Sequence, residues 1–356
     1  MSPFLAVALL LLMAGTVFLL PLVPAMLELH RKSDAMPLSV IQQYTGDIRH
    51  FSESFRNYIR ELEPALRSSF SSGAVATGTL PGGTDYLVLG RGEEALQLPL
   101  KERDELCPVL IATRSDLLLP SDTTFSKDIY AGGRFIGGKK NRYRAILGEK
   151  DVHLSTESSV MRWVHAVGEF RADAACKLYG RVSSDRAIYL QKDCFFQRLN
   201  APRVESGAGS DGTEESVERL EGQTDFTGQR RSLLDGDCNI GAGETFHGNL
   251  VVRGTVRIGA GARIFGSVKG DKNVVLEEGA SVEGSLISAG QMWIGPNCSV
   301  HGPVIAERFL QVERGTRCGS ADRPTTVSAP SIDVEEGVVV FGTLWAREHG
   351  QVVAKS

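Results

Sequence analysis

The residues of this chain that could do chemistry are six cysteines and two histidines, His247 and His301, which are 54 residues apart. Thiols serve as nucleophiles and zinc ligands, and a histidine beside a carboxylate can act as a general base. No cysteines form a C-x-x-C pair or follow a zinc spacing, and no carboxylate is obviously poised beside His247 or His301. The sequence therefore predicts no catalytic, cofactor or metal site. The cysteines are Cys107, Cys176, Cys194, Cys238, Cys298 and Cys318.

A glycine pattern offers a second candidate. The stretch from Tyr86 to Ala95 (YLVLGRGEEA) resembles a strand followed by a G-x-G-x-x-A dinucleotide loop. Pro99 follows so closely that no helix amino terminus is available to hold a pyrophosphate. We therefore interpret this stretch as a turn between strands.

The composition favours a folded protein that does not bind nucleic acid through its overall charge. The 356 residues include 39 basic and 43 acidic side chains, a net charge of −4, which argues against a nucleic-acid binder that relies on bulk electrostatics. Hydrophobic residues make up 42 % of the chain, so most of it should fold, and the 39 glycines suit many tight turns. Scattered unpaired cysteines agree with a reducing compartment.

The amino terminus is predicted to anchor in a membrane. Residues 2–27 carry no charge and would span about 39 Å as a helix, enough for a hydrocarbon core of about 30 Å. The alternative is a cleaved signal peptide, but no basic residue precedes the run. Arg31 and Lys32 follow it, so the positive-inside rule predicts a single-pass membrane protein with most of the chain in the cytoplasm. The predicted anchor, residues 1–30, includes Phe4, Leu10, Val17 and Leu20.

Apolar residues at heptad spacing predict a helical neck over residues 31–70. This neck is either a self-associating stalk beneath the membrane or an amphipathic helix that lies on its own domain. Pro64 is expected to limit the helix. The residues that step alternately by three and four are Ile41, Tyr44, Ile48, Phe51, Phe55, Tyr58 and Leu62.

An eighteen-residue repeat organises the rest of the chain. In the first half of the chain, this period relates Leu154, Ala172 and Leu190. Leu190 and Ile240 are separated by one period plus 32 residues. These 32 extra residues indicate a polar, disordered insertion that loops out of one continuous stack of turns. The clearest column, with a spacing of 18, is Ile240, Ile258, Leu276, Ile294 and Val312.

Three short strands in each period, joined by tight corners, predict a triangular β-solenoid of about ten turns. The cysteines at 176, 194 and 298 share a column with small residues, so we expect them to fill corners of this solenoid. Along the chain we expect an irregular connector that can include the first strands (71–115), a first block of rungs (116–204), the insertion (205–234), a second block (235–347) and a tail (348–356).

The carboxy-terminal part resembles the bactofilins, the polymer-forming cytoskeletal proteins of bacteria. The stretches VRIGAGARIFGSV (256–268) and VVLEEGASVEGSLISA (274–289) carry the resemblance, which is clearest over residues 236–346 and fainter over 118–204. It implies a right-handed triangular β-helix whose copies stack into filaments without nucleotide, as membrane-associated scaffolds for cell shape or envelope assembly. The expected fold class is therefore all-β, a right-handed β-helix with an amino-terminal transmembrane helix and a short amphipathic helix.

A solenoid end that lacks a cap exposes apolar side chains and unpaired strand edges. The last rung is followed by only a dozen residues, so we expect it to be bare and to dock on the terminal rung of another subunit. Val340→Asp would then stop assembly and largely spare the fold. The expected partners are other copies of the chain, the inner membrane and envelope or cell-shape proteins, with no nucleic acid. The predicted assembly residues are Val334, Val338, Val340, Leu344, Phe341 and Trp345.

Two other functions stay open. Hexapeptide acyltransferases use left-handed turns of the same length, and Ile258-Gly-Ala-Gly-Ala-Arg fits their hexad, with His247 or His301 as the base. The insertion could supply an active-site loop, but it contains no histidine. An envelope adaptor that never polymerises would share the fold and differ only in assembly.

Overall fold

The computed structural model describes residues 49–90, 106–207 and 231–354, with a few isolated residues before position 21. The chain divides into two compact units, residues 1–47 and residues 48–356. Most of the predicted anchor, including Val17, and residues 31–48 of the predicted neck lie outside the described residues, whereas Phe4, Leu10 and Leu20 are described and exposed. None of the helices described is both long and apolar enough to cross a bilayer.

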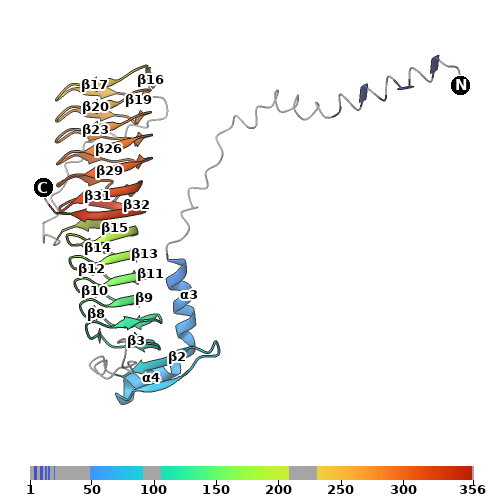
Figure 1. The fold of residues 1–356 in the computed structure, drawn as a ribbon, viewed down its shortest axis with the longest axis vertical. Helices are drawn as coiled ribbons and strands as arrows, with labels where there is room; N and C mark the ends of the chain where they lie inside the picture. Colours follow the sequence, from blue (N-terminus) through green and yellow to red (C-terminus); the bar gives the residue numbers. More distant parts are fainter. Residues whose placement is uncertain are drawn as a thin grey trace. The chain divides into compact units, whose positions relative to one another are not determined.

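The unit that follows residue 47 is a stack of short strands, wound into a right-handed solenoid of about twelve turns in the described ranges (Figure 1). It consists of block one, residues 106–207, and block two, residues 231–354. The strands of block one are β3 (Leu106–Cys107), β4 (Leu110–Thr113), β5 (Leu117–Leu118), β6 (Thr124–Phe125), β7 (Ile129–Ala131), β8 (Phe135–Gly137), β9 (Arg142–Gly148), β10 (Val152–Leu154), β11 (Ser159–Ala166), β12 (Phe170–Ala172), β13 (Lys177–Ser184), β14 (Ala187–Leu190) and β15 (Phe195–Ser206).

Block two repeats the same architecture with shorter strands until its last two. Its strands are β16 (Arg231–Leu234), β17 (Cys238–Ile240), β18 (Thr245–His247), β19 (Asn249–Val252), β20 (Val256–Ile258), β21 (Arg263–Phe265), β22 (Val268–Gly270), β23 (Val274–Leu276), β24 (Ser281–Val282), β25 (Leu286–Ser288), β26 (Gln291–Ile294), β27 (Ser299–Val300), β28 (Val304–Ala306), β29 (Phe309–Val312), β30 (Arg317–Cys318), β31 (Thr325–Glu335) and β32 (Val339–Val353).

The register of the strands confirms the eighteen-residue period. Ile258 pairs with Leu276, and Leu276 pairs with Ile294, so equivalent positions stack directly in parallel strands. These three side chains are at most 1 % exposed. Burial of each contributes about 1.5–3 kcal/mol before the loss of chain entropy is subtracted. The predicted β-solenoid is therefore the observed fold.

Corners of the solenoid bring two backbones close together. A side chain at Gly266 would place its Cβ atom 2.0 Å from the carbonyl oxygen of Gly248 in the previous turn, so the glycine column is a steric requirement. In block one, left-handed corners are taken by ordinary residues such as Lys140 (φ 58°) and Ala175 (φ 60°). This conformation costs an L-residue about 1–2 kcal/mol, so the stacked strands must offset that strain.

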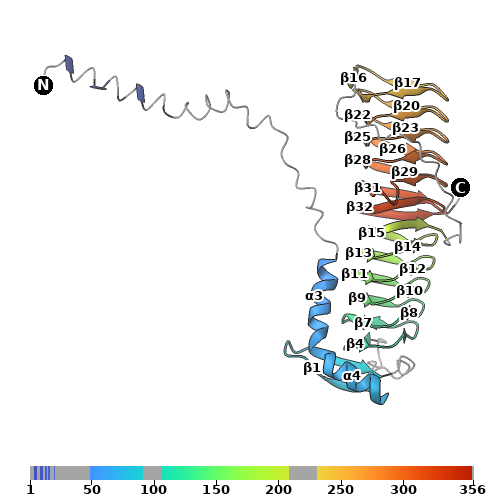
Figure 2. The same cartoon turned by 180° about the vertical axis from the view of Figure 1, so that it is seen from behind.

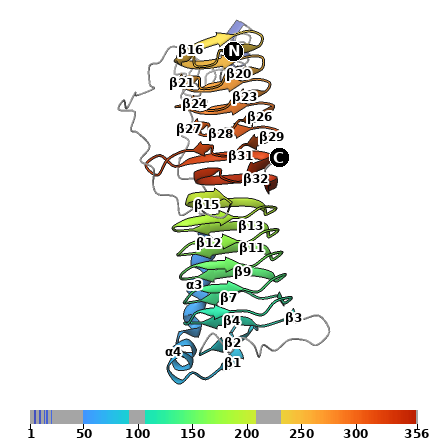
Figure 3. The same cartoon turned by 90° about the vertical axis from the view of Figure 1, so that its left-hand side faces the viewer.

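The two blocks run in opposite directions along the solenoid axis. β15 pairs antiparallel with β32, which places Leu199 opposite Leu344. In Figures 2 and 3, β32 lies beside β15, whereas β16 lies at the far tip of block two. The predicted continuous stack is therefore wrong, because Ile240 lies near that far tip and does not stack on Leu190. The period of a repeat is the same in either direction, so it could not reveal this reversal.

The reversal also changes the segments around the blocks. Residues 205 and 206, assigned to the insertion, belong to β15, and residues 231–234 form β16. Residues 208–230 lie outside the described ranges. Residues 348–353, expected to be a tail, belong to β32. The end of block two is thus longer than the repeat alone predicts.

Two helices and a hairpin pack on block one. α3 (His50–Ile59) continues through the 3-10 turn η2 (Arg60–Leu62) into α4 (Glu63–Ser72), where Pro64 occupies the first turn instead of ending the helix. Phe55 packs edge-on against Trp163 of β11, with ring centroids 5.5 Å apart. The hairpin of β1 (Ala76–Thr79) and β2 (Asp85–Leu89) extends the edge of β4. From residue 49 onward, the neck is therefore an amphipathic helix that lies on its own domain.

Candidate functional site

The cysteine column is structural. Cys176, Cys194 and Cys298 are at most 1 % exposed, as expected for fillers of the corners. Their thiols donate to main-chain carbonyl oxygens at 3.3, 3.1 and 3.0 Å. Burial raises the pKa of Cys298 to about 11 and the pKa of Cys318 to about 12. Very little of either thiol is therefore in the reactive thiolate form at neutral pH.

His301 has a carboxylate neighbour that the sequence reading missed. Its Nδ1 atom lies 3.4 Å from Oε2 of Glu283, which stands one turn earlier in the stack. The signal was available, because positions 283 and 301 differ by one period. His247 instead stacks on the ring of Phe265, with centroids 4.8 Å apart. In the described ranges, no three His, Cys, Asp or Glu side chains are grouped so that they could hold a metal ion.

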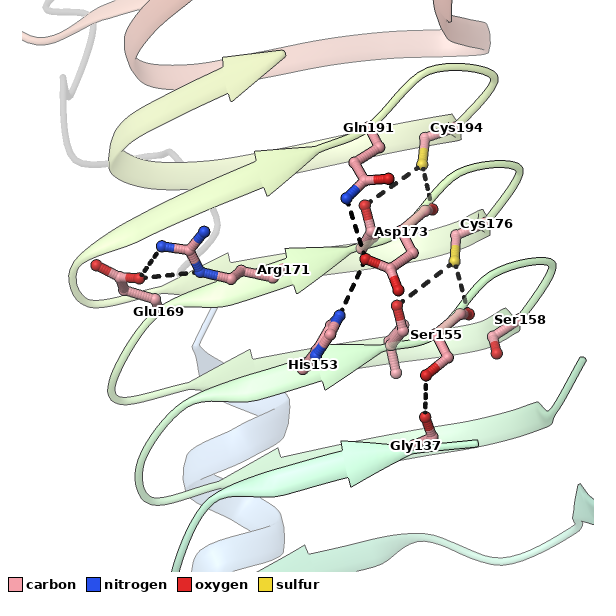
Figure 4. A network of polar contacts seen from close by, with 12 residues as sticks. Gly137, His153, Ser155, Ser158, Glu169, Arg171, Asp173, Cys176, Gln191 and Cys194 are labelled. Atoms are coloured by element: carbon pink, nitrogen blue, oxygen red, sulfur yellow. Dashed lines mark hydrogen bonds and ion pairs between the residues drawn. The ribbon is translucent and has the colours of Figure 1, made fainter. Parts of the chain in front are cut away.

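A polar ladder on block one also brings a histidine to a carboxylate (Figure 4). Nε2 of His153 lies 3.0 Å from Oδ1 of Asp173, and the same oxygen accepts a hydrogen bond from Gln191 at 3.2 Å. Among the described residues, no hydroxyl or thiol bonds to His153, because the nearby thiols of Cys176 and Cys194 donate to the backbone. The ladder therefore ties successive turns together and assembles no pair of nucleophile and base.

The predicted assembly residues lie at a junction between the two blocks of the same chain. Val340 pairs with Val204 of β15, and Trp345 pairs with Arg198. The expectation of a bare last rung is therefore wrong, since the end of block one covers it. Trp345 stays 39 % exposed at the rim, and Phe341 is half-buried. The side chains that line a small cavity at the junction include Leu190, Val204, Val334, Val338, Val340 and Leu344.

Polar contacts fix the register of this junction. The hydroxyl of Ser206 accepts a hydrogen bond from the main-chain N–H of Val338 at 3.0 Å. The side-chain amide of Asn200 donates to the hydroxyl of Thr343 at 2.9 Å. Buried polar groups that find partners in one arrangement favour that arrangement over its alternatives. The junction is therefore specific as well as apolar.

The opposite end of block two is open in the part of the chain that the structure describes. β16, β17 and β18 pair only with β19, β20 and β21, so one edge of each strand has no partner there. Leu234 continues an inward ladder through buried Val252, yet it is 41 % exposed, and Leu233 is 56 % exposed. An uncovered strand edge beside apolar side chains is a template for pairing with another chain. We call β16, β17 and β18 the open end.

Comparison with known families identifies most of block two. Residues 238–344 match the family model Bactofilin, described as polymer-forming cytoskeletal. We call the matched residues 238–344 the bactofilin domain. The resemblance inferred over residues 236–346 is thereby confirmed, and the description of the family is that of a structural polymer and not of an enzyme. No curated protein and no solved structure matches the chain.

The bactofilin domain begins in β17 and ends within β32. One end of the domain therefore lies within the open end, directly after β16, and the other end lies at the junction. Block one lies outside the matched residues, although it has the same period and the same stacked strands. The solenoid fold therefore extends well beyond the residues that match the family model.

Proposed function

We propose that the protein is a self-associating scaffold whose copies pair through the open end of the bactofilin domain. The observation that carries this proposal is the open end itself, with three strands paired on one side and Leu234 exposed at the tip of an inward ladder. A polymer-forming cytoskeletal family supports association between copies. Pairing of strand edges requires neither nucleotide nor a catalytic group.

The junction inside the chain supplies a precedent for the geometry. Two copies related by a twofold axis at the open end would bring like strands together in antiparallel fashion. β15 and β32 meet in the same orientation at the other end of the bactofilin domain. Among the described residues, block one covers the junction and no strand covers the open end, which leaves the open end for a second copy.

Leu234→Asp should abolish this association, because it places a charge where an apolar contact between copies would form. We expect the full-length wild-type chain in mild detergent to shift from monomer to dimer as its concentration rises in sedimentation velocity, while Leu234→Asp stays monomeric. Leu118→Asp is the matched control, since Leu118 is 55 % exposed but lies in block one. A wild-type chain that stays monomeric at every concentration, or a Leu234→Asp chain that pairs equally well, would refute the proposal.

We further propose that the amino-terminal segment anchors this scaffold in a membrane. The uncharged run over residues 2–27, followed by Arg31 and Lys32, supports the anchor and its orientation. Full-length protein should remain in the membrane pellet through an alkaline carbonate wash and leave it in detergent. A chain that lacks residues 2–27 should be found in the supernatant. Release of the full-length protein by carbonate would contradict the anchor.

A further inference from the structure

A groove on the side of block one crosses the junction next to the start of α3. Strand register places Trp163 beside Arg181, Arg181 beside Arg198, and Arg198 beside Trp345. Two arginines thus lie between two tryptophans on four adjacent strands, which are about 4.8 Å apart. The lining residues that matter here are Phe51, Met161, Arg181, Arg198, Trp345 and Arg347.

Among the residues that the structure describes, the arginines of the groove have no carboxylate partner. None of the ion pairs in the described part of the chain includes Arg181, Arg198 or Arg347. Carboxylates of block one that face α3 are already engaged, Asp185 with Arg49 at 3.1 Å and Glu149 with Arg56 at 2.8 Å. The groove therefore carries positive charge that the described residues of the chain do not neutralise.

Arg198 is the clearest sign of a missing ligand. Its Nε atom is buried and has no hydrogen-bond partner within the described ranges. Burial lowers the pKa of Arg198, and the positive charge of Arg181 lowers it further. A buried donor without an acceptor and two like charges on adjacent strands both cost free energy, and a bound anion would relieve both.

Aromatic rings hold these guanidinium groups in place. The guanidinium of Arg181 lies 5.0 Å from the ring centroid of Phe51, and that of Arg198 lies 5.1 Å from the ring of Trp345. A guanidinium over a ring keeps its N–H edge free for a carboxylate. Met161 is 46 % exposed and Trp345 is 39 % exposed, so apolar surface adjoins the charges.

We propose that this groove binds an acidic peptide segment of a partner protein. Its carboxylates would pair with Arg181 and Arg198, and an aliphatic or aromatic side chain would pack against Trp345 and Met161. Charge complementarity argues for an acidic occupant, and the apolar rim argues for a side chain beside the acid. The site is concave and bounded by Phe51 of α3, which suits a narrow peptide better than the flat surface of a bilayer.

The probe for this site is a fluorescein-labelled octapeptide of alternating Glu and Leu, titrated against the full-length protein in mild detergent by fluorescence anisotropy. We expect saturable binding that weakens with salt. Arg198→Gln should weaken binding by about tenfold or more, because a charge-assisted hydrogen bond is lost. Trp345→Ala should also weaken it, whereas a Glu-Ser octapeptide should bind less well than the Glu-Leu peptide, and a Lys-Leu octapeptide should not bind.

The matched control is Arg263→Gln, an exposed arginine of β21 in block two, which should leave the affinity unchanged. Circular dichroism of each variant shows whether the solenoid is intact. Failure of the Glu-Leu peptide to bind, or equal binding by Arg198→Gln, would overturn the proposal. Binding of short-chain phosphatidylglycerol that depends on Arg198, without peptide binding, would also overturn it and assign the groove to lipid.

Discussion

A Val340→Asp chain is expected to lose the contact between its two blocks while each block keeps its own solenoid core. Val340 is 1 % exposed and lies opposite Val204, so the substitution puts a carboxylate into the apolar centre of the junction. An unpaired buried charge costs several kcal/mol, to which the lost apolar burial adds about 1.5–3 kcal/mol. The sequence predicted that this change would block assembly between subunits. In the structure, the contact that it disrupts joins the two blocks of one chain.

An engineered disulfide can report the state of the junction. The side chains of Asn200 and Thr343 meet at 2.9 Å across β15 and β32, so cysteines at both positions should cross-link in an otherwise wild-type chain. The cross-link should fail to form when Val340→Asp is added. Ile305→Asp is the matched control, because Ile305 is 38 % exposed on the outer face of β28. Equal cross-linking in the Val340→Asp chain would show that the junction tolerates the charge.

Shortening the segment between the blocks should have a sharp length threshold. Seven successive strand pairings separate β16 from β15. At about 4.8 Å for each pairing, β15 and β16 are separated by about 34 Å along the solenoid axis. A fully extended chain covers about 3.4 Å per residue, so about ten residues are the minimum. We expect a segment of about fourteen residues to preserve the junction and a segment of about four residues to break it.

The same engineered disulfide and the midpoint of thermal unfolding measure this effect. Replacing residues 208–230 by a Gly-Ser segment of unchanged length is the control, because it alters sequence and keeps reach. A four-residue segment that still allows the cross-link would mean that block two begins beside β15. That result would restore the continuous stack that the repeat suggested, so the experiment distinguishes the two chain paths.

The repeat predicted most of the core because it acts locally. Each inward position must stack on its equivalent one turn away, so Ile258, Leu276 and Ile294 had to be buried together, and the small residues at the Cys298 column had to fit a corner. The packing of the helix on its own domain could also be predicted, since Phe55 and Leu62 share an apolar face that packs on block one. These features depend on neighbours that a fixed spacing identifies.

The functional surfaces were harder to predict because they depend on the direction of each block. The contact of Arg198 with Trp345 and the burial of Val340 both follow from antiparallel pairing between segments well over a hundred residues apart. No spacing in the sequence encodes that pairing. Leu234 illustrates the converse, since it continues an inward column and is exposed only because block two starts there.

The pairing of β15 with β32 also has a consequence for how the protein is made. Translation produces β15 long before β32, which is the last of the described strands to be synthesised. Throughout that interval the apolar tip around Leu190 and Val204 lacks its cover on the nascent chain. Such a tip is a hazard for misassociation on crowded polysomes, and a message that terminates early would leave it permanently exposed. We therefore expect the cell to shield this surface with a chaperone until the final strand arrives, and ribosome-associated chaperone profiling should show occupancy that starts after β15 and ends with β32.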